Sequence, residues 1–233
     1  MKRKILFTLA IVLLSLASAS AQTTQATINE YLKSAERGDA AGQNNLGNSY
    51  YYGYGVTQNY QQAIYWFEKA AGQGFADAQY NLASCFYNGN GIEKNISEAI
   101  VWFEKAAKQG HAGAQNNLGT CYFNGQGVKK DPKKAYEWFE KAALQGHAGA
   151  QNNLGLCYTE GKGTTRNHSK AAEMYRKAAE QGNAIGQYNL AVCYDNGQGV
   201  KQDRKEAKKW LSKSVQQGNA KAAKLAKKKR FNE

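Results

Sequence analysis

The chain has 233 residues, of which 42% are hydrophobic, and it carries a formal net charge of +13. After residue 16 no stretch is apolar enough to cross a membrane, which takes roughly 17–25 residues, so the composition excludes a protein of several membrane-spanning helices. Residues 200–233 hold twelve Lys or Arg residues and three acidic ones, so most of the positive charge lies at the C-terminal end. A protein that binds nucleic acid specifically would be expected to carry basic residues along its whole binding surface, so this distribution argues against that class of function.

The first 21 residues have the three-part layout of a secretory signal. A basic stub from Lys2 to Lys4 precedes an apolar run over 5–16, and small residues ending in Ala21 follow. The apolar run is too short for a permanent anchor, so we expect cleavage after Ala21. We therefore predict that residues 1–21 are a signal peptide and that the chain is exported, either periplasmic or secreted, with no transmembrane segment.

Residues 22–39 are predicted to hold a capping helix, over 26–37, ahead of a 36-residue repeat. Alanine recurs at 40, 76, 112, 148, 184 and 220. A fixed period of this length indicates a stacked array, because one unit cannot bury its apolar face without neighbours. The predicted units are 40–75, 76–111, 112–147, 148–183 and 184–219.

Each unit is predicted to form two helices. The first begins at the periodic alanine and ends at two glycines, such as Gly89 and Gly91, which accept a left-handed backbone. The second begins after a capping Asn or Asp, and Pro132 suits its first position. The capping residues are Asn59, Asn95, Asp131, Asn167 and Asp203. One position, held by Trp66, Trp102, Trp138, Met174 and Trp210, is interpreted as core between stacked units.

Residues 220–233 are predicted to form a C-terminal capping helix and a basic tail. Ala226 stands where the units have leucine, and lysines follow. Polar terminal units close the exposed core of a repeat array. The run Lys227, Lys228, Lys229 and Arg230 suits either contact with an anionic envelope polymer or a solvated end that keeps the array soluble.

One cysteine holds the same position in four units, at Cys85, Cys121, Cys157 and Cys193. Equivalent helices of stacked units lie at least about 8–10 Å apart, whereas a disulfide needs Cα atoms within about 6.8 Å. Four thiols spread along an array also cannot converge on one zinc ion. We interpret the cysteines as free, buried thiols that act as small apolar side chains.

The unit as a whole resembles the Sel1-like repeat family, a subclass of the tetratricopeptide superfamily, in the pattern AxAQxNLGxxYxxGxGVxxDxxxAxxWFxKAAxQG over 40–219. The resemblance implies an all-α, right-handed solenoid of paired antiparallel helices with a concave inner surface. Family members are mostly adaptors that hold other proteins, and the motif carries no catalytic residue. It therefore implies a monomeric, non-enzymatic adaptor without cofactor or metal, whose partner is an unidentified protein or peptide.

One cysteine-rich branch of exported members has been associated with penicillin binding and β-lactamase activity. A weak β-lactamase-like hydrolase is therefore an alternative function. The repeats of that branch resemble a pattern with two cysteines. In this chain the matching positions hold Ala71 and Gln79. No S-x-x-K element or combination of Ser, His and carboxylate stands out either. The sequence favours a protein without enzymatic activity.

The candidate binding residues are on the first helices. An asparagine precedes each periodic leucine, at Asn45, Asn81, Asn117, Asn153 and Asn189. In tetratricopeptide arrays the matching asparagine commonly faces the concave groove, and a row of amides suits an extended peptide because each offers two donors and an acceptor. The alternative is that each Asn ties its unit to the neighbouring turn. The position before it varies between units, so Tyr80 and Tyr188 are predicted to determine specificity.

Overall fold

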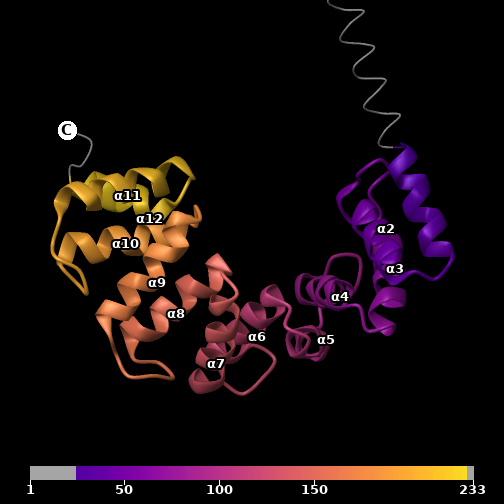
Figure 1. Cartoon of the computed structure of the whole chain (residues 1–233), viewed down its shortest axis with the longest axis horizontal. Coiled ribbons are helices and arrows are strands. Elements are labelled where there is room, and N and C mark those ends of the chain that lie inside the picture. The colour runs from indigo at the N-terminus through magenta and orange to yellow at the C-terminus, as the bar shows by residue number, and fades with distance from the viewer. Residues whose placement is uncertain (1–24, 230–233) are drawn as a thin grey trace, which may run out of the picture. The chain divides into compact units, whose positions relative to one another are not determined.

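The structure is a computed structural model that describes residues 25–229, and all regular structure in this part of the chain is α-helical (Figure 1). The chain divides into two compact units, residues 1–106 and 107–233, which are treated separately below. The predicted signal peptide over 1–21 and the tail residue Arg230 lie outside the described residues. The fold is the all-α repeat solenoid that the sequence predicts.

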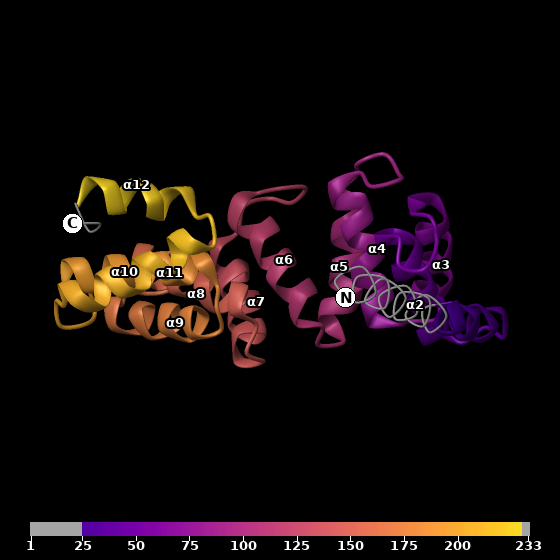
Figure 2. The same cartoon turned by 90° about the horizontal axis from the view of Figure 1, so that it is seen from above.

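The first unit opens with helical residues 25–36, inside the predicted capping segment. Its further helices are α2 (Ala40–Tyr52), α3 (Tyr60–Gly72), α4 (Ala76–Asn88) and most of α5 (Ile96–Lys108). The second unit holds α6 (Ala112–Asn124), α7 (Pro132–Leu144), α8 (Ala148–Glu160), α9 (His168–Glu180), α10 (Ala184–Asn196), α11 (Arg204–Gln216) and α12 (Ala220–Lys228). In the second unit α8 packs on α9, α9 on α10, and α10 on α11, so each helix pair packs against the next pair along the chain (Figure 2).

The helix starts follow from the capping residues. Every first helix begins at its periodic alanine, as predicted. The predicted caps of the second helices are confirmed: the carboxylate of Asp131, for example, accepts from the amides of Lys133 and Lys134. His111 and His147 cap α6 and α8 through their side chains.

The glycine pair after each first helix is needed at both positions. Gly125 ends α6 in a left-handed conformation, with φ 75°, and its N–H donates to the carbonyl of Cys121 at 2.8 Å. Gly163, the second glycine of the fourth repeat, has φ 74°, and a Cβ there would meet the carbonyl oxygen of Pro132. The loop therefore lies directly against the second helix of the preceding repeat, and a larger residue would push it away.

The most deeply buried position on the second helices is the residue that follows the tryptophan position, which the sequence analysis interpreted as core. Phe67 and Phe103 are 1% and 0% exposed, whereas Trp66 and Trp102 are only half-buried. The reason is the helical period, because Phe67 shares one face with the buried alanines three and four residues away from it, while the preceding tryptophan lies at the edge of that face. Equivalent buried residues are Phe139, Tyr175 and Leu211. The core assignment of the tryptophan position is therefore correct only for Trp210, which is 8% exposed.

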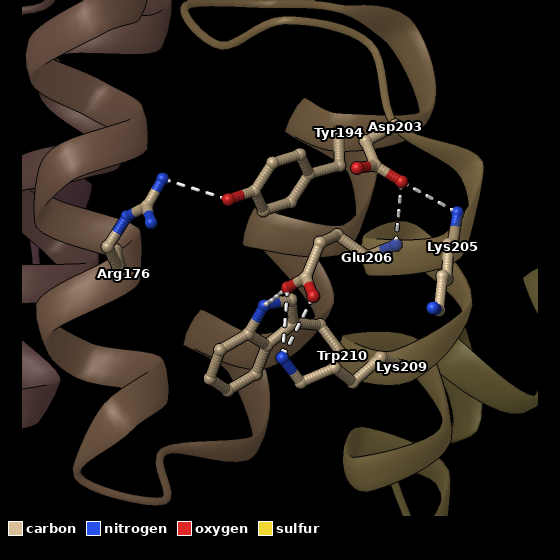
Figure 3. Close-up of polar contacts among 7 residues, drawn as sticks. All are labelled: Arg176, Tyr194, Asp203, Lys205, Glu206, Lys209 and Trp210. Carbon is tan, nitrogen blue, oxygen red and sulfur yellow. Dashed lines mark hydrogen bonds and ion pairs between the residues drawn. The ribbon is translucent and has the colours of Figure 1, made fainter.

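At the edge of the core, polar neighbours fix the indole. Trp210 Nε1 donates to Glu206 Oε2 at 3.0 Å, and Lys209 Nζ forms an ion pair with the same carboxylate at 2.9 Å (Figure 3). In the same region Arg176 of α9 donates to the hydroxyl of Tyr194 of α10 at 2.9 Å (Figure 3). Side chains outside the apolar core thus also join successive repeats.

Candidate functional site

Three of the predicted asparagines bond the first helix of the preceding repeat. Asn153 Nδ2 donates to Asn116 Oδ1 at 2.9 Å, and Asn189 Nδ2 donates to Asn152 Oδ1 at 2.8 Å. In the first unit Asn81 Nδ2 donates in the same way to Asn44, at 2.9 Å. These bonds use one of the two N–H donors that each amide nitrogen carries. They also explain the asparagines at 44, 116 and 152, which act as the acceptors.

A hollow along the first helices lies in the second unit. It has a volume of about 490 Å³ and is lined by Asn152, Leu156, Ala184, Ile185, Tyr188, Asn189, Gln217, Gly218, Asn219, Ala220 and Lys221. Tyr188 and Asn189, both predicted as binding residues, come together in it. Ile185 is 55% exposed beside them. The hollow thus combines an aromatic ring, an exposed aliphatic side chain and two amides that hold each other in place.

Two other predicted asparagines also line hollows. Asn45 lines one of about 440 Å³ in the first unit, together with Tyr31, Asn48 and Tyr54. Tyr54 is 64% exposed, and its ring stacks on that of Tyr52 with centroids 5.3 Å apart. Asn153 lines a smaller hollow of about 160 Å³ between α6 and α8 in the second unit.

Tyr80 and Asn117 have different surroundings. The half-buried ring of Tyr80 lies against Phe103, with centroids 5.9 Å apart, so part of it belongs to the core of the first unit. Asn117 Oδ1 accepts from Asn116 Nδ2 of the same helix at 3.4 Å. Tyr188 is likewise half-buried and packs against the core of the second unit, but it also lines the hollow of about 490 Å³.

The described part of the basic tail is held by an ion pair. Lys229 Nζ lies 2.8 Å from the carboxylate of Asp195, which is on α10. Lys227 and Lys228 are exposed at the end of α12. The four tail residues singled out in the sequence are thus not one free cluster, because Lys229 is paired within the fold.

The main feature that the sequence analysis missed is a buried glutamine in every repeat. The residues are Gln43, Gln79, Gln115, Gln151 and Gln187, each 4–5% exposed. Gln115 Nε2 donates to the carbonyl of Ala107 at 3.1 Å, and its Oε1 accepts from Gln145 Nε2 at 2.8 Å. The signal was present as two glutamines at a strict 36-residue period, one after each periodic alanine and one before each closing glycine.

Burial shifts the pKa values of the cysteines and of His147 in the repeats. All four cysteines are free and buried, and burial raises the pKa of Cys85 to about 12 and that of Cys121 to about 11. Such thiols stay protonated at neutral pH and are poor nucleophiles. Burial, followed by the charge of His111, lowers the pKa of His147, whose Nδ1 accepts from the amide of Ala150 at 3.1 Å.

Residues 25–229 contain no cluster of three His, Cys, Asp or Glu side chains that could hold a metal ion. Within the same residues, none of the helices combines the length and apolar character needed to cross a bilayer. The features that the structure offers for binding are therefore the hollows and the amides described above.

A model of the Sel1 repeat family matches the chain five times, over residues 40–75, 76–111, 112–147, 148–183 and 184–219. The Sel1 repeat protein from Oxalobacter formigenes is 35% identical, with a TM-score of 0.82 over 91% of this chain and 85% of that one. The chain also resembles c5321, a protective antigen of uropathogenic Escherichia coli with an SLR fold, at 35% identity and a TM-score of 0.74 over 92% of this chain and 50% of that one. An immunity protein from Pseudomonas aeruginosa, Pa5087, shares the fold at 24% identity and a TM-score of 0.55, over 81% of this chain and 72% of that one. No curated protein matches.

Proposed function

The chain belongs to the Sel1 repeat family, and from this premise we propose that it is an exported, non-enzymatic adaptor that binds a protein or peptide along its first helices. Sel1 repeats generally mediate protein–protein interaction. The observation that carries the proposal is the hollow of about 490 Å³ in which Tyr188 and Asn189 lie together beside the exposed Ile185. Binding pockets are mostly apolar concavities with a few well-placed polar groups, which is the composition of this hollow.

An extended peptide suits this hollow because the hollow offers apolar groups for the peptide's side chains and polar groups for its backbone. Ile185 and Leu156 offer an apolar surface for a side chain, and Tyr188 adds a ring with little rotamer freedom to lose. The half-buried Asn189 can bond a peptide amide with the capacity that its bond to Asn152 leaves over, while Asn152 is buried and also donates to Asn153 at 3.4 Å. Because the bond between Asn189 and Asn152 fixes both side chains before a ligand arrives, less conformational entropy is lost on binding.

The proposed absence of enzymatic activity is supported by the state of the strongest nucleophiles. The four thiols are buried, and burial raises the pKa of Cys157 to about 12. A catalytic thiol needs a depressed pKa and access to substrate. Purified protein is therefore expected to hydrolyse a chromogenic cephalosporin no faster than a mock-purified control. A rate that survives repurification and falls on a single substitution would favour the hydrolase alternative.

The binding proposal is tested by crosslinking the protein in its native cells, identifying the partner by mass spectrometry, and measuring affinity with the purified partner. Tyr188→Ala is expected to weaken binding by about 2 kcal/mol, which is roughly 30-fold. The matched control is Tyr65→Ala, which removes a tyrosine that is 47% exposed on α3. Tyr65→Ala should melt like the wild type, whereas Tyr188→Ala also removes packing against the core of the second unit, so affinity is compared at a temperature at which thermal melting shows both variants folded.

One result would move the site elsewhere. If Tyr188→Ala binds normally while joint neutralisation of Lys227, Lys228, Lys229 and Arg230 abolishes binding, the tail is the binding site. Asp195→Asn serves as the control for that variant, because it removes the ion-pair partner of Lys229 without changing the tail.

Export is proposed from residues 1–21 alone. N-terminal sequencing of the protein from fractionated cells is expected to show a chain that begins at Gln22 in the periplasmic or secreted fraction. Recovery of the uncleaved chain from the cytoplasm alone would contradict export and leave the binding proposal to be judged by the affinity measurements.

A further inference from the structure

We propose that the second unit carries a docking site for a tryptophan side chain of a partner protein, at the point where the fourth repeat lacks a tryptophan of its own. This site goes beyond the proposed function, because residues of α7, α8 and α9 line it, and none of them lines the hollow around Tyr188. The argument starts from the repeats in which the chain fills the same place itself.

In the second and fifth repeats an indole occupies this place. Trp210 is 8% exposed and belongs to the same core cluster as Ala179 and Leu190. Trp102 packs against the cluster that contains Ala71 and Leu82, the equivalent residues three repeats earlier. The indole thus belongs to, or packs against, the core cluster that contains the end of the preceding second helix and the periodic leucine.

A lysine covers the exposed side of these rings. The Nζ atom of Lys105 lies 3.6 Å from the ring centroid of Trp102, and that of Lys213 lies 4.7 Å from Trp210. The lysine is three residues after the tryptophan in both cases, where the helix brings it over the ring. Figure 3 shows Trp210 with Glu206, which accepts from its N–H. The place is therefore built for an aromatic ring between an apolar floor and a cation.

The fourth repeat keeps the floor but not the ring. Met174 takes the tryptophan position, and the equivalents of the floor residues, Ala143 and Leu154, are still buried. A hollow of about 380 Å³ lies there, lined by Glu140, Ala143, Leu144, Gly146, Gln151, Leu154, Tyr158, Lys170, Glu173, Met174 and Lys177. A thioether is slimmer and more flexible than an indole, so it leaves space and can move aside.

A second departure from the repeat falls on the same hollow. Leu144, at the end of α7, is 84% exposed. The other repeats have Gly72, Lys108, Glu180 and Gln216 at this position. The loss of the indole and the exposed leucine thus fall on the same hollow, and together they add apolar surface there.

The covering cation is also present. Lys177 is three residues after Met174 and pairs with Glu173 at 2.8 Å, but both side chains are about half exposed, at 51% and 56%. Exposed pairs of this kind contribute little to stability, so Lys177 can turn over a bound ring. The rim carries Lys170 and Glu140 as well, and its charges are therefore mixed. The aromatic ring, and not the sign of charge, is what this site selects.

The test uses N-acetyl-tryptophan amide as the probe and the whole purified chain, followed by methyl NMR. We expect saturable shifts of the Leu144 and Met174 methyl signals, with N-acetyl-leucine amide at least about tenfold weaker. Met174→Trp should abolish binding because the chain then fills the hollow itself, and it should stay folded because other repeats tolerate Trp there. Met174→Leu is the matched control and should bind like the wild type.

Three results would overturn the proposal: shifts that do not saturate, leucine amide binding as well as tryptophan amide, or Met174→Trp binding as well as the wild type. If Met174→Trp does not fold, Leu144→Lys is tested in its place. This variant introduces the residue that the second repeat has at the equivalent position, Lys108, and it should weaken probe binding by at least about fivefold. Tyr188→Ala should leave probe binding unchanged, which separates this site from the proposed peptide hollow.

Discussion

The side-chain oxygen of Gln187 accepts a 2.8 Å hydrogen bond from Nε2 of Gln217, 30 residues later in the chain. Gln187 Nε2 in turn donates to the carbonyl of Ala179 at 3.2 Å. One buried amide therefore joins the end of α9, the start of α10 and the C-cap of α11. Burying an amide is costly unless its groups are paired, and here both its oxygen and its nitrogen are.

Gln187→Leu is expected to lower the free energy of unfolding by about 1–3 kcal/mol, because the carbonyl of Ala179 and the amide of Gln217 lose their partner while the side chain stays similar in size. Urea denaturation measures the change. Gln216→Leu, on the exposed face of α11, is the matched control and should stay within about 0.5 kcal/mol of the wild type. Equal effects of the two variants would show that the buried bond has no special role.

Phe103→Ala should destabilise the first unit by about 3–5 kcal/mol, because the side chain is fully buried and leaves a cavity. Trp102→Ala removes a half-buried ring and should cost clearly less. Thermal melting of the two variants under one buffer compares them directly. A larger loss for Trp102→Ala would restore the interpretation of the tryptophan position as the main core position.

His147→Asn is expected to remove part of the acid sensitivity of the protein. The lowered pKa of His147 means that the folded chain binds this proton less tightly than the unfolded chain, so stability is lost as the pH falls below the ordinary value of 6.5. Asparagine caps the same position at Asn183 and Asn219 without titrating. At about pH 5 the variant should be more stable than the wild type, and near pH 7.5 the two should be alike. A wild type that is the more stable of the two at low pH would contradict this sign.

The four thiols should react with a disulfide reagent only after unfolding. In the folded chain they are buried, and burial raises the pKa of Cys193 to about 11, so little thiolate forms at neutral pH. In denaturant without reductant, four thiols are expected to titrate at once. Fewer than four would indicate a disulfide, and rapid reaction in native buffer would indicate that at least one thiol is accessible.

The period of the sequence was enough to place the helices. Alanine at each start, Asn or Asp at each second cap and paired glycines are local signals, because a cap or a left-handed turn depends on a few neighbouring residues. For the same reason Asp131 and Gly125 were assigned correctly from the sequence.

Properties that depend on rotation about a helix axis were harder to predict. Trp102 and Phe103 are adjacent and both aromatic, so the sequence offers two core candidates, and only the packing shows that the second points inward. The partner of Asn189 lies 37 residues earlier in the chain, and such a contact follows from the angle between stacked helices rather than from any local pattern. The hollow beside Met174 is likewise visible only when the repeats are compared in space.

The bonds between repeats also bear on how such a chain can change in length. Gln181 bonds Gln151 across 30 residues, and Asn189 bonds Asn152 across 37, and equivalent pairs recur one repeat earlier. Deleting residues 148–183 as a block would bring Gln217 and Gln187 into the sequence positions that follow Gln145, with the same spacings as before. Loss of this 36-residue segment therefore conserves both pairings, whereas loss of a single residue inside it shifts the spacing of every pair that spans the gap. Loss of residues 112–147 would not be equivalent, because Asn153 would then follow Tyr80 instead of its acceptor Asn116. Which repeat is lost therefore decides whether the bonds between neighbours survive.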